Sequence, residues 1–188
     1  MYMFLKKANT LILIFIISIF IVKINSEDLL FEDFSSFNEK NWEFISDRVM
    51  GGISSGNYQI ISENKESFLR LKGFVSIENN GGFIQVRKVL TGKKILKFIG
   101  VEVKCRGNDA NYFIHIRTKF TLLPWQYYQG KFYASSNWKS IKIDLKSFKG
   151  SGSLLPKRIN SQHIKSIAIV AYGREHRVRL DVSEIKFY

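Results

Sequence analysis

The chain has little cysteine, proline or histidine, and each scarcity excludes a class of structure or site. Its one cysteine, Cys105, cannot form an intrachain disulfide. The three histidines, His115, His163 and His176, lack the spacing of metal ligands and have no neighbouring cysteine, so we expect no metal and no other cofactor. A glycine-rich phosphate loop between a strand and a helix is also missing. We therefore predict that the chain has no catalytic residue and is not an enzyme.

Long amphipathic helical patterns are missing as well, and short segments of alternating apolar and polar residues recur instead. The clearest of these are residues 69–77, 84–87, 101–106, 112–117, 141–146 and 178–182. Many short strands with one apolar face predict an antiparallel β-sandwich. We also predict a central strand at Ile164–Ala171, a buried thiol at Cys105, and a β-bulge near Ser183, where the apolar alternation changes parity.

The N-terminus has the pattern of an export signal. Lys6 and Lys7 precede an apolar run from Leu11 to Val22, which is shorter than the roughly 20 residues that a membrane span needs. A basic segment followed by a short apolar segment is typical of a signal peptide, and we predict cleavage after Ser26. The alternative is an uncleaved anchor. Either way, residues 27–188 would form one exported domain, periplasmic or extracellular, that contacts the membrane only through residues 1–26.

The formal net charge is +13, and a basic chain can bind nucleic acid, anionic lipid or an acidic glycan. The positive residues are nevertheless scattered singly, and the densest pairs are Lys93-Lys94 and Lys157-Arg158. This scatter favours an ordinary solvated surface, and we predict no nucleic-acid partner.

Two glycine-rich segments, 46–56 and 73–87, carry the most specific pattern. Paired glycines permit positive φ and close approach of two backbones. Without any function, this pattern predicts a tight loop at Gly51-Gly52 and a β-hairpin at Asn79–Gly82. Asp47, Arg48 and Asn80 add hydrogen-bonding side chains next to these glycines, which makes both segments candidates for a binding surface.

These segments resemble the signature of the complex I intermediate-associated protein family, the thirty-kilodalton type. The similarity continues through 106–112, 125–128, Phe132, Trp138 and the closing 185–188, and it covers the chain from about Phe31 onward. The sequence departs from the family pattern at Asn108-Asp109, where the family has Asp-Gly. The resemblance implies a galactose-binding-domain-like jelly roll and an accessory, chaperone-like protein that assembles respiratory complex I.

Under that resemblance we predict a protein-binding surface in which Asp and Arg side chains fix each other and the glycine loops. The aromatic residues add a second possibility, because alternation puts Trp125 and Tyr127 on one face of a strand and Tyr128 on the other. An aromatic platform of this kind would suit an envelope glycan, so a carbohydrate-binding module is the alternative function. A third is an envelope hydrolase, which needs a carboxylate or histidine cluster in a deep pocket. The candidate binding residues are Asp47, Arg48, Met50, Gly51, Gly52, Ser54, Asn79, Asn80, Gly81, Gly82, Arg87, Arg106, Asp109, Trp125 and Tyr127.

Overall fold

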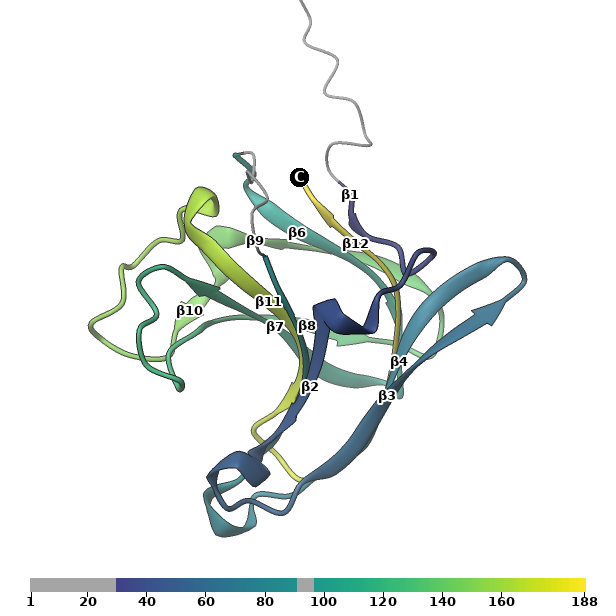
Figure 1. The fold of residues 1–188 in the computed structure, drawn as a ribbon, viewed down its shortest axis with the longest axis horizontal. Coiled ribbons are helices and arrows are strands. Elements are labelled where there is room, and N and C mark those ends of the chain that lie inside the picture. The colour runs from purple at the N-terminus through teal and green to yellow at the C-terminus, as the bar shows by residue number, and fades with distance from the viewer. Residues whose placement is uncertain (1–29, 91–96) are drawn as a thin grey trace, which may run out of the picture.

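The computed structural model describes residues 30–90 and 97–188, which form two antiparallel six-stranded sheets packed face to face (Figure 1). The first sheet has the order β3 (Ser55–Glu63), β4 (Glu66–Val75), β12 (His176–Phe187), β6 (Gly100–Arg106) and β9 (Lys139–Asp144), and β1 (Leu30–Glu32) also pairs with β12. The second sheet has the order β10 (Lys149–Gly150), β8 (Tyr128–Ala134), β7 (Ala110–Thr118), β11 (Ile164–Tyr172), β5 (Phe83–Val89) and β2 (Trp42–Ser46).

The predicted all-β jelly-roll sandwich is therefore confirmed. The helical segments in the described residues are short 3-10 turns, among them η3 (Asp47–Met50) and η4 (Glu78–Asn80). None of the helices in this part of the chain has the length and apolar character needed to cross a membrane. The predicted signal segment 1–26 lies outside the described residues.

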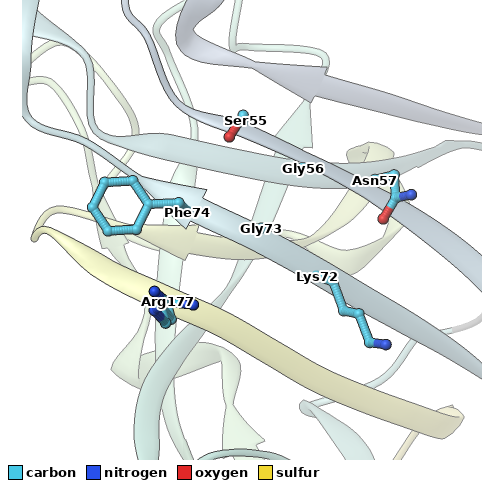
Figure 2. A pocket seen from close by; sticks show the side chains of 7 residues that line it. All are labelled: Ser55, Gly56, Asn57, Lys72, Gly73, Phe74 and Arg177. Carbon is cyan, nitrogen blue, oxygen red and sulfur yellow. The ribbon is translucent and has the colours of Figure 1, made fainter.

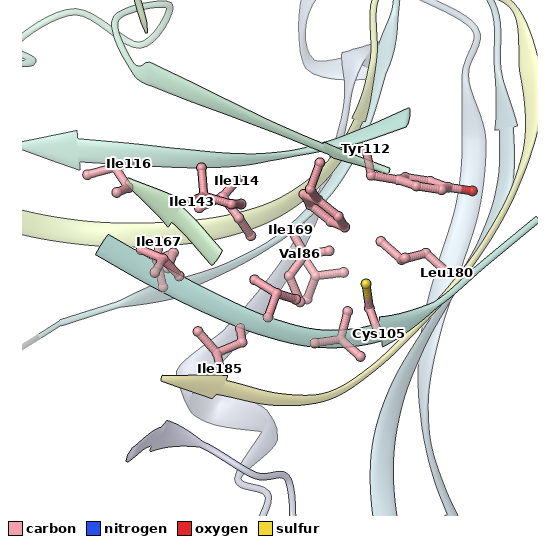
Figure 3. Packing of buried hydrophobic residues seen from close by; sticks show 14 of the residues in the cluster. Val86, Cys105, Tyr112, Ile114, Ile116, Ile143, Ile167, Ile169, Leu180 and Ile185 are labelled. Atoms are coloured by element: carbon pink, nitrogen blue, oxygen red, sulfur yellow. The ribbon is translucent and has the colours of Figure 1, made fainter. Parts of the chain in front are cut away.

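Apolar side chains from the two sheets meet in one core (Figure 3). Ile114, Ile116 and Ile169 of the second sheet are fully buried, and so are Leu180 and Ile185 of the first. Burying a side chain of this size stabilises the fold by about 1.5–3 kcal/mol. The alternation read from the sequence thus marks the inner face of each strand.

Three local predictions are confirmed. β11 is central in its sheet, between β7 and β5. The pairing of β12 with β6 shifts register between Val182 and Glu184, which places the bulge at Ser183. Cys105 is buried, and that burial raises the pKa of its thiol to about 12, so the group is an inert part of the core.

The predicted hairpin at Asn79–Gly82 is wrong. β4 pairs with β3 and β12, whereas β5 pairs with β11 and β2, so this segment carries the chain from one sheet to the other. Asn79 and Asn80 both take the left-handed conformation, with φ of 54° and 57°. Asparagine tolerates that region, so the residues that suggested a two-stranded turn form a crossing between layers instead.

Two glycines face each other on the paired strands β3 and β4 of the first sheet. Gly56 pairs with Gly73, and both line a shallow depression that also includes Phe74 and Arg177 (Figure 2). A Cβ at Gly73 would lie 2.2 Å from the carbonyl oxygen of Ser55 and 2.9 Å from Cδ1 of Ile84. Only glycine lets the two backbones and the core side chain approach this closely.

We predict that Gly73→Ala lowers the free energy of unfolding by about 1–3 kcal/mol, the usual cost of overpacking. Lys72→Ala is the matched control, because Lys72 directly precedes Gly73 on β4 and its side chain is exposed. It should change the free energy of unfolding by no more than about 0.5 kcal/mol. Urea unfolding measures both. Equal stability of the two variants would contradict the close packing at Gly73.

Candidate binding cleft

A cleft of about 330 Å³ lies on the outer face of the second sheet, the face turned away from the core. Side chains of β5, β7 and β11 form its floor, the loop between β7 and β8 forms one border, and residues of η3 and η4 form another. The lining residues are Met50, Asn80, Gly81, Phe83, Gln85, Arg87, His115, Arg117, Pro124, Trp125, Tyr127, Ser151, Ser166, Ala168 and Tyr172.

One row of paired residues crosses the floor of the cleft. Strand register aligns Gln129, His115, Ala168, Arg87 and Glu43 from β8 to β2. Neighbours in such a row have their Cβ atoms only about 5 Å apart. At the centre of the row, the methyl group of Ala168 lies between the imidazole of His115 and the guanidinium of Arg87. Because the methyl group is shorter than its two neighbours, the cleft is deepest there.

Aromatic rings form one wall. Tyr127 stacks on His115 with ring centroids 4.0 Å apart and planes inclined by 10°, and Tyr172 meets both rings edge-on. Trp125 lies at the rim with 64% of its surface exposed. An exposed indole beside a packed aromatic wall presents a flat apolar face to solvent.

The loop that carries Trp125 is held by hydrogen bonds at several points. Nη2 of Arg117 donates to the carbonyl oxygens of Thr121 and Leu123, at 3.2 and 2.9 Å. On the other side, the Ser151 hydroxyl donates to the carbonyl oxygen of Trp125 and accepts from the amide of Tyr127. These contacts position the aromatic rim of the cleft before any ligand arrives.

His115 is neutral in this wall. Burial lowers the pKa of its imidazole to about 3. The side-chain amide nitrogen of Gln129 lies 2.9 Å from Nε2 of His115, and an amide nitrogen can only donate, so this ring nitrogen accepts. A neutral ring stacked on Tyr127 extends the aromatic surface without adding charge.

Asp47 supports the opposite border. Its fully buried carboxylate accepts from the amide of Ser54 at 2.9 Å, the hydroxyl of Ser54 at 2.5 Å, and the amides of Gly82 and Phe83 at 2.6 and 3.2 Å. Burial by itself raises the pKa of Asp47, but these hydrogen bonds outweigh it and hold the pKa below its ordinary value. One charged group thereby ties η3 to the start of β5.

The paired glycines are explained by this carboxylate. A Cβ at Gly52 would lie 2.4 Å from Cγ of Asp47, and a Cβ at Gly81 would lie 2.5 Å from its Oδ2. Gly51 takes φ of 91° and Gly82 takes φ of 138°, conformations that other residues rarely adopt. We call Asp47, Gly52, Ser54, Gly81 and Gly82 the Asp47 clasp.

The structure separates the predicted binding residues into three groups. Met50, Asn80, Gly81, Arg87, Trp125 and Tyr127 line the cleft. Asp47, Gly52, Ser54 and Gly82 are buried in the clasp, while Arg48, Gly51 and Asn79 are exposed beside it. Arg106 and Asp109 line a different cavity of about 680 Å³, formed with Arg70 and Asp181 of the first sheet.

The predicted pairing of Asp and Arg side chains in the glycine loops is wrong. The donors to the carboxylate of Asp47 belong to Ser54, Gly82 and Phe83, and Arg48 donates through Nε to the carbonyl oxygen of Ser54 instead. Asp47 braces the two glycine-rich loops through these donors, without an arginine. Whether the remaining candidates bind a partner stays a prediction.

Several cleft residues were missing from the predicted set, including Gln85, Arg117, Ser166, Ala168 and Tyr172. Gln85 and Arg117 stand on the polar faces of alternating strands, so their direction was readable from the sequence. Ser166 and Ala168 lie in an apolar run that gave no sign of a second, open face. Within 30–90 and 97–188, no group of His, Cys, Asp and Glu side chains is arranged to hold a metal ion.

We predict that the buried clasp is needed for stability. Asp47→Ala leaves several buried donors without an acceptor and should lower the free energy of unfolding by about 3–5 kcal/mol. Glu66→Ala is the matched control, since the ion pair of Glu66 with Lys104 is exposed at 3.5 Å, and it should cost under about 0.5 kcal/mol. Urea unfolding at pH 7 compares the two, and similar losses would refute the bracing role.

We predict that His115 makes the fold sensitive to mild acid. Its pKa is near 6.5 when unfolded and about 3 when folded, so between these values only the unfolded chain takes up the proton and stability falls as pH falls. From pH 7 to pH 5 this group should cost about 2 kcal/mol. His115→Gln should remove that part of the loss, as urea unfolding at both pH values will measure. An unchanged loss would mean that the folded protein protonates His115.

Solved structures share this fold. The family 11 carbohydrate-binding module of a Clostridium thermocellum cellulase superposes with a TM-score of 0.68 at 16% identity, covering 84% of this chain and 92% of that one. The same module in complex with a β-1,3-1,4-mixed-linked tetrasaccharide gives 0.66 at 16%, covering 85% and 94%. An exo-β-agarase gives 0.56 at 8%, with 85% of this chain covering 25% of the enzyme.

At these identities the likeness concerns the fold alone. A comparison with curated protein sequences finds no match. The sequence profile of complex I intermediate-associated protein 30, in contrast, matches residues 30–182, which include all but a few of the described positions. The chain therefore belongs to the complex I intermediate-associated protein 30 family.

Proposed function

We propose that this domain binds a saccharide chain in the cleft on the second sheet, without acting on it chemically. The observation that carries the proposal is the combination of an exposed indole, a packed aromatic wall and polar side chains around one low floor. Sugar rings have apolar faces and a rim of hydroxyl groups. Trp125 and Tyr127 offer flat surfaces to the first, and Gln85, Asn80 and the arginines offer donors and acceptors to the second.

The preformed geometry supports the same proposal. Tyr127 is stacked, the Trp125 loop is anchored by Arg117 and Ser151, and the clasp fixes the border that carries Asn80 and Gly81. A site ordered in advance loses little conformational entropy when a ligand binds. The fold shared with carbohydrate-binding modules agrees with a saccharide ligand but does not by itself establish one. Export directed by residues 1–26, which we also propose, would bring the cleft to glycans of the cell envelope or its surroundings.

We expect the wild-type domain to bind at least one glycan on a glycan array. Trp125→Ala should bind the glycan that the wild type binds best at least about tenfold more weakly, which is about 1.4 kcal/mol. Since Trp125 is largely exposed, thermal unfolding should be unchanged. Phe120→Ala is the matched control, an exposed aromatic residue of the same loop that does not line the cleft. The proposal would be overturned if the wild-type domain bound no glycan on the array, or if Trp125→Ala bound as tightly as the wild type.

Family membership favours a second candidate, in which the domain holds a protein partner, as the family's association with complex I intermediates suggests. A specific surface is available for it, because Val49, Met50 and Ile53 expose apolar side chains on and beside η3, next to the clasp. Crosslinking in intact cells separates the two functions. A reproducible protein crosslink near Val49, together with an empty glycan array, would select the protein-binding function.

A further inference from the structure

The cleft is positively charged. Arg87 and Arg117 line it, while none of its fifteen lining residues is aspartate or glutamate, and His115 is neutral. Arg87 is paired with one acid, Glu43, whose carboxylate accepts from Nη2 of Arg87 at 2.7 Å and stays more than half exposed. Two cations against one partly solvated anion leave the floor with an excess of positive charge.

Both guanidinium groups keep donors free. Nε of Arg87 is buried and donates to nothing in the described part of the chain. Nη2 of Arg117 is used by the carbonyl oxygens of Thr121 and Leu123, whereas its Nε and Nη1 meet no acceptor among residues 30–90 and 97–188. Both side chains thus have hydrogen-bonding capacity that the described residues leave unused, and a ligand with acceptor groups can take it up.

The two arginines also repel each other. The pKa of Arg117 is lowered, first by burial and then by the positive charge of Arg87. An anionic group placed between them would relieve this repulsion and could accept two parallel hydrogen bonds from one guanidinium. A neutral hydroxyl can accept a hydrogen bond but does not relieve the repulsion.

The charge of the surrounding chain acts in the same direction. Residues 110–174, which contain β7, β8 and β11 of the cleft, hold eleven lysines and arginines and a single acid, Asp144. Asp144 lies on β9, in the other sheet. This third of the sequence therefore carries a net charge of +10 out of the total of +13, and such a field attracts anions before they make contact.

We infer that the ligand of the cleft is an anionic saccharide, whose carboxylate or sulfate group binds between Arg87 and Arg117 while an adjacent sugar ring packs on Trp125 and Tyr127. This inference rests on the proposed saccharide function and narrows it to one class of ligand. Ala168 provides the room, because its methyl group sits between His115 and Arg87 in the central row of the floor.

Titration calorimetry with the whole domain in 150 mM salt tests this inference with three oligosaccharides of equal length. An oligogalacturonate carries carboxylates, a chondroitin sulfate fragment carries sulfates, and a mixed-linked β-glucan fragment is neutral. At least one anionic ligand should bind tenfold or more tightly than the neutral one. The anionic ligand with the higher affinity then shows whether the arginines bind a carboxylate or a sulfate group.

Two cleft variants and one control locate the effect. Arg117→Gln should weaken the anionic ligand tenfold or more, and because Arg117 also anchors the Trp125 loop it should weaken the neutral ligand too, by a smaller factor. Arg87→Gln should weaken the anionic ligand tenfold or more and the neutral ligand less than threefold, because the side chain of Arg87 is hydrogen-bonded to Glu43 and not to the Trp125 loop in the described part of the chain. The control Arg158→Gln removes the same charge from an exposed position outside the cleft and should change all affinities less than threefold.

Each outcome decides something. A preference for the neutral fragment would overturn the anionic class of ligand while leaving saccharide binding intact. Equal losses of affinity in Arg87→Gln and Arg158→Gln would do the same, because they would mean that only the overall charge attracts polyanions. Binding of none of the three, together with an empty glycan array, would end the saccharide function itself. A loss in Arg87→Gln that is confined to the anionic ligands would support the inference.

Discussion

A single buried carboxylate organises the binding end of this sandwich. Asp47 accepts hydrogen bonds from groups that lie 7 to 36 residues further along the sequence, and it does so where the chain passes between the two sheets. Without it, the backbone amides of Ser54, Gly82 and Phe83 would be buried without acceptors. Gly52 and Gly81 leave the space that this carboxylate occupies. The most recognisable residues of the sequence thus hold the border of the cleft, and other residues face its interior.

The sequence was sufficient to predict the architecture because each strand has one apolar side facing the shared core. It was insufficient for strands whose second side, away from the core, is also covered or lines the cleft. Ser166 and Ala168 of β11 look like ordinary members of an apolar run, yet they form part of the cleft floor. Asn79 to Gly82 have the composition of a hairpin, and pairing partners far away in sequence decided instead that the segment joins two sheets.

Arg106 illustrates how polar residues with similar sequence surroundings are divided between structure and binding. Register places Asp181 between Arg70 and Arg106 on the outer face of the first sheet. Nε and Nη2 of Arg70 donate to this carboxylate at 2.6 Å, and Nε of Arg106 donates at 2.8 Å. Arg106 also covers the rings of Phe68 and Trp138. Its Nε, its Nη2 and its flat face are already occupied, whereas Arg87 and Arg117 each keep donors that no described residue accepts.

The alanine at the middle of the cleft floor has a consequence for the diversity of such domains. Strand register fixes the backbone at Ala168 from both sides, and its side chain points away from the core. The length of that one side chain therefore sets the depth of the groove, independently of the packing that keeps the sheets together. Exchange at this position offers a route by which the same scaffold acquires a shallower or narrower site without a change in the core between the sheets.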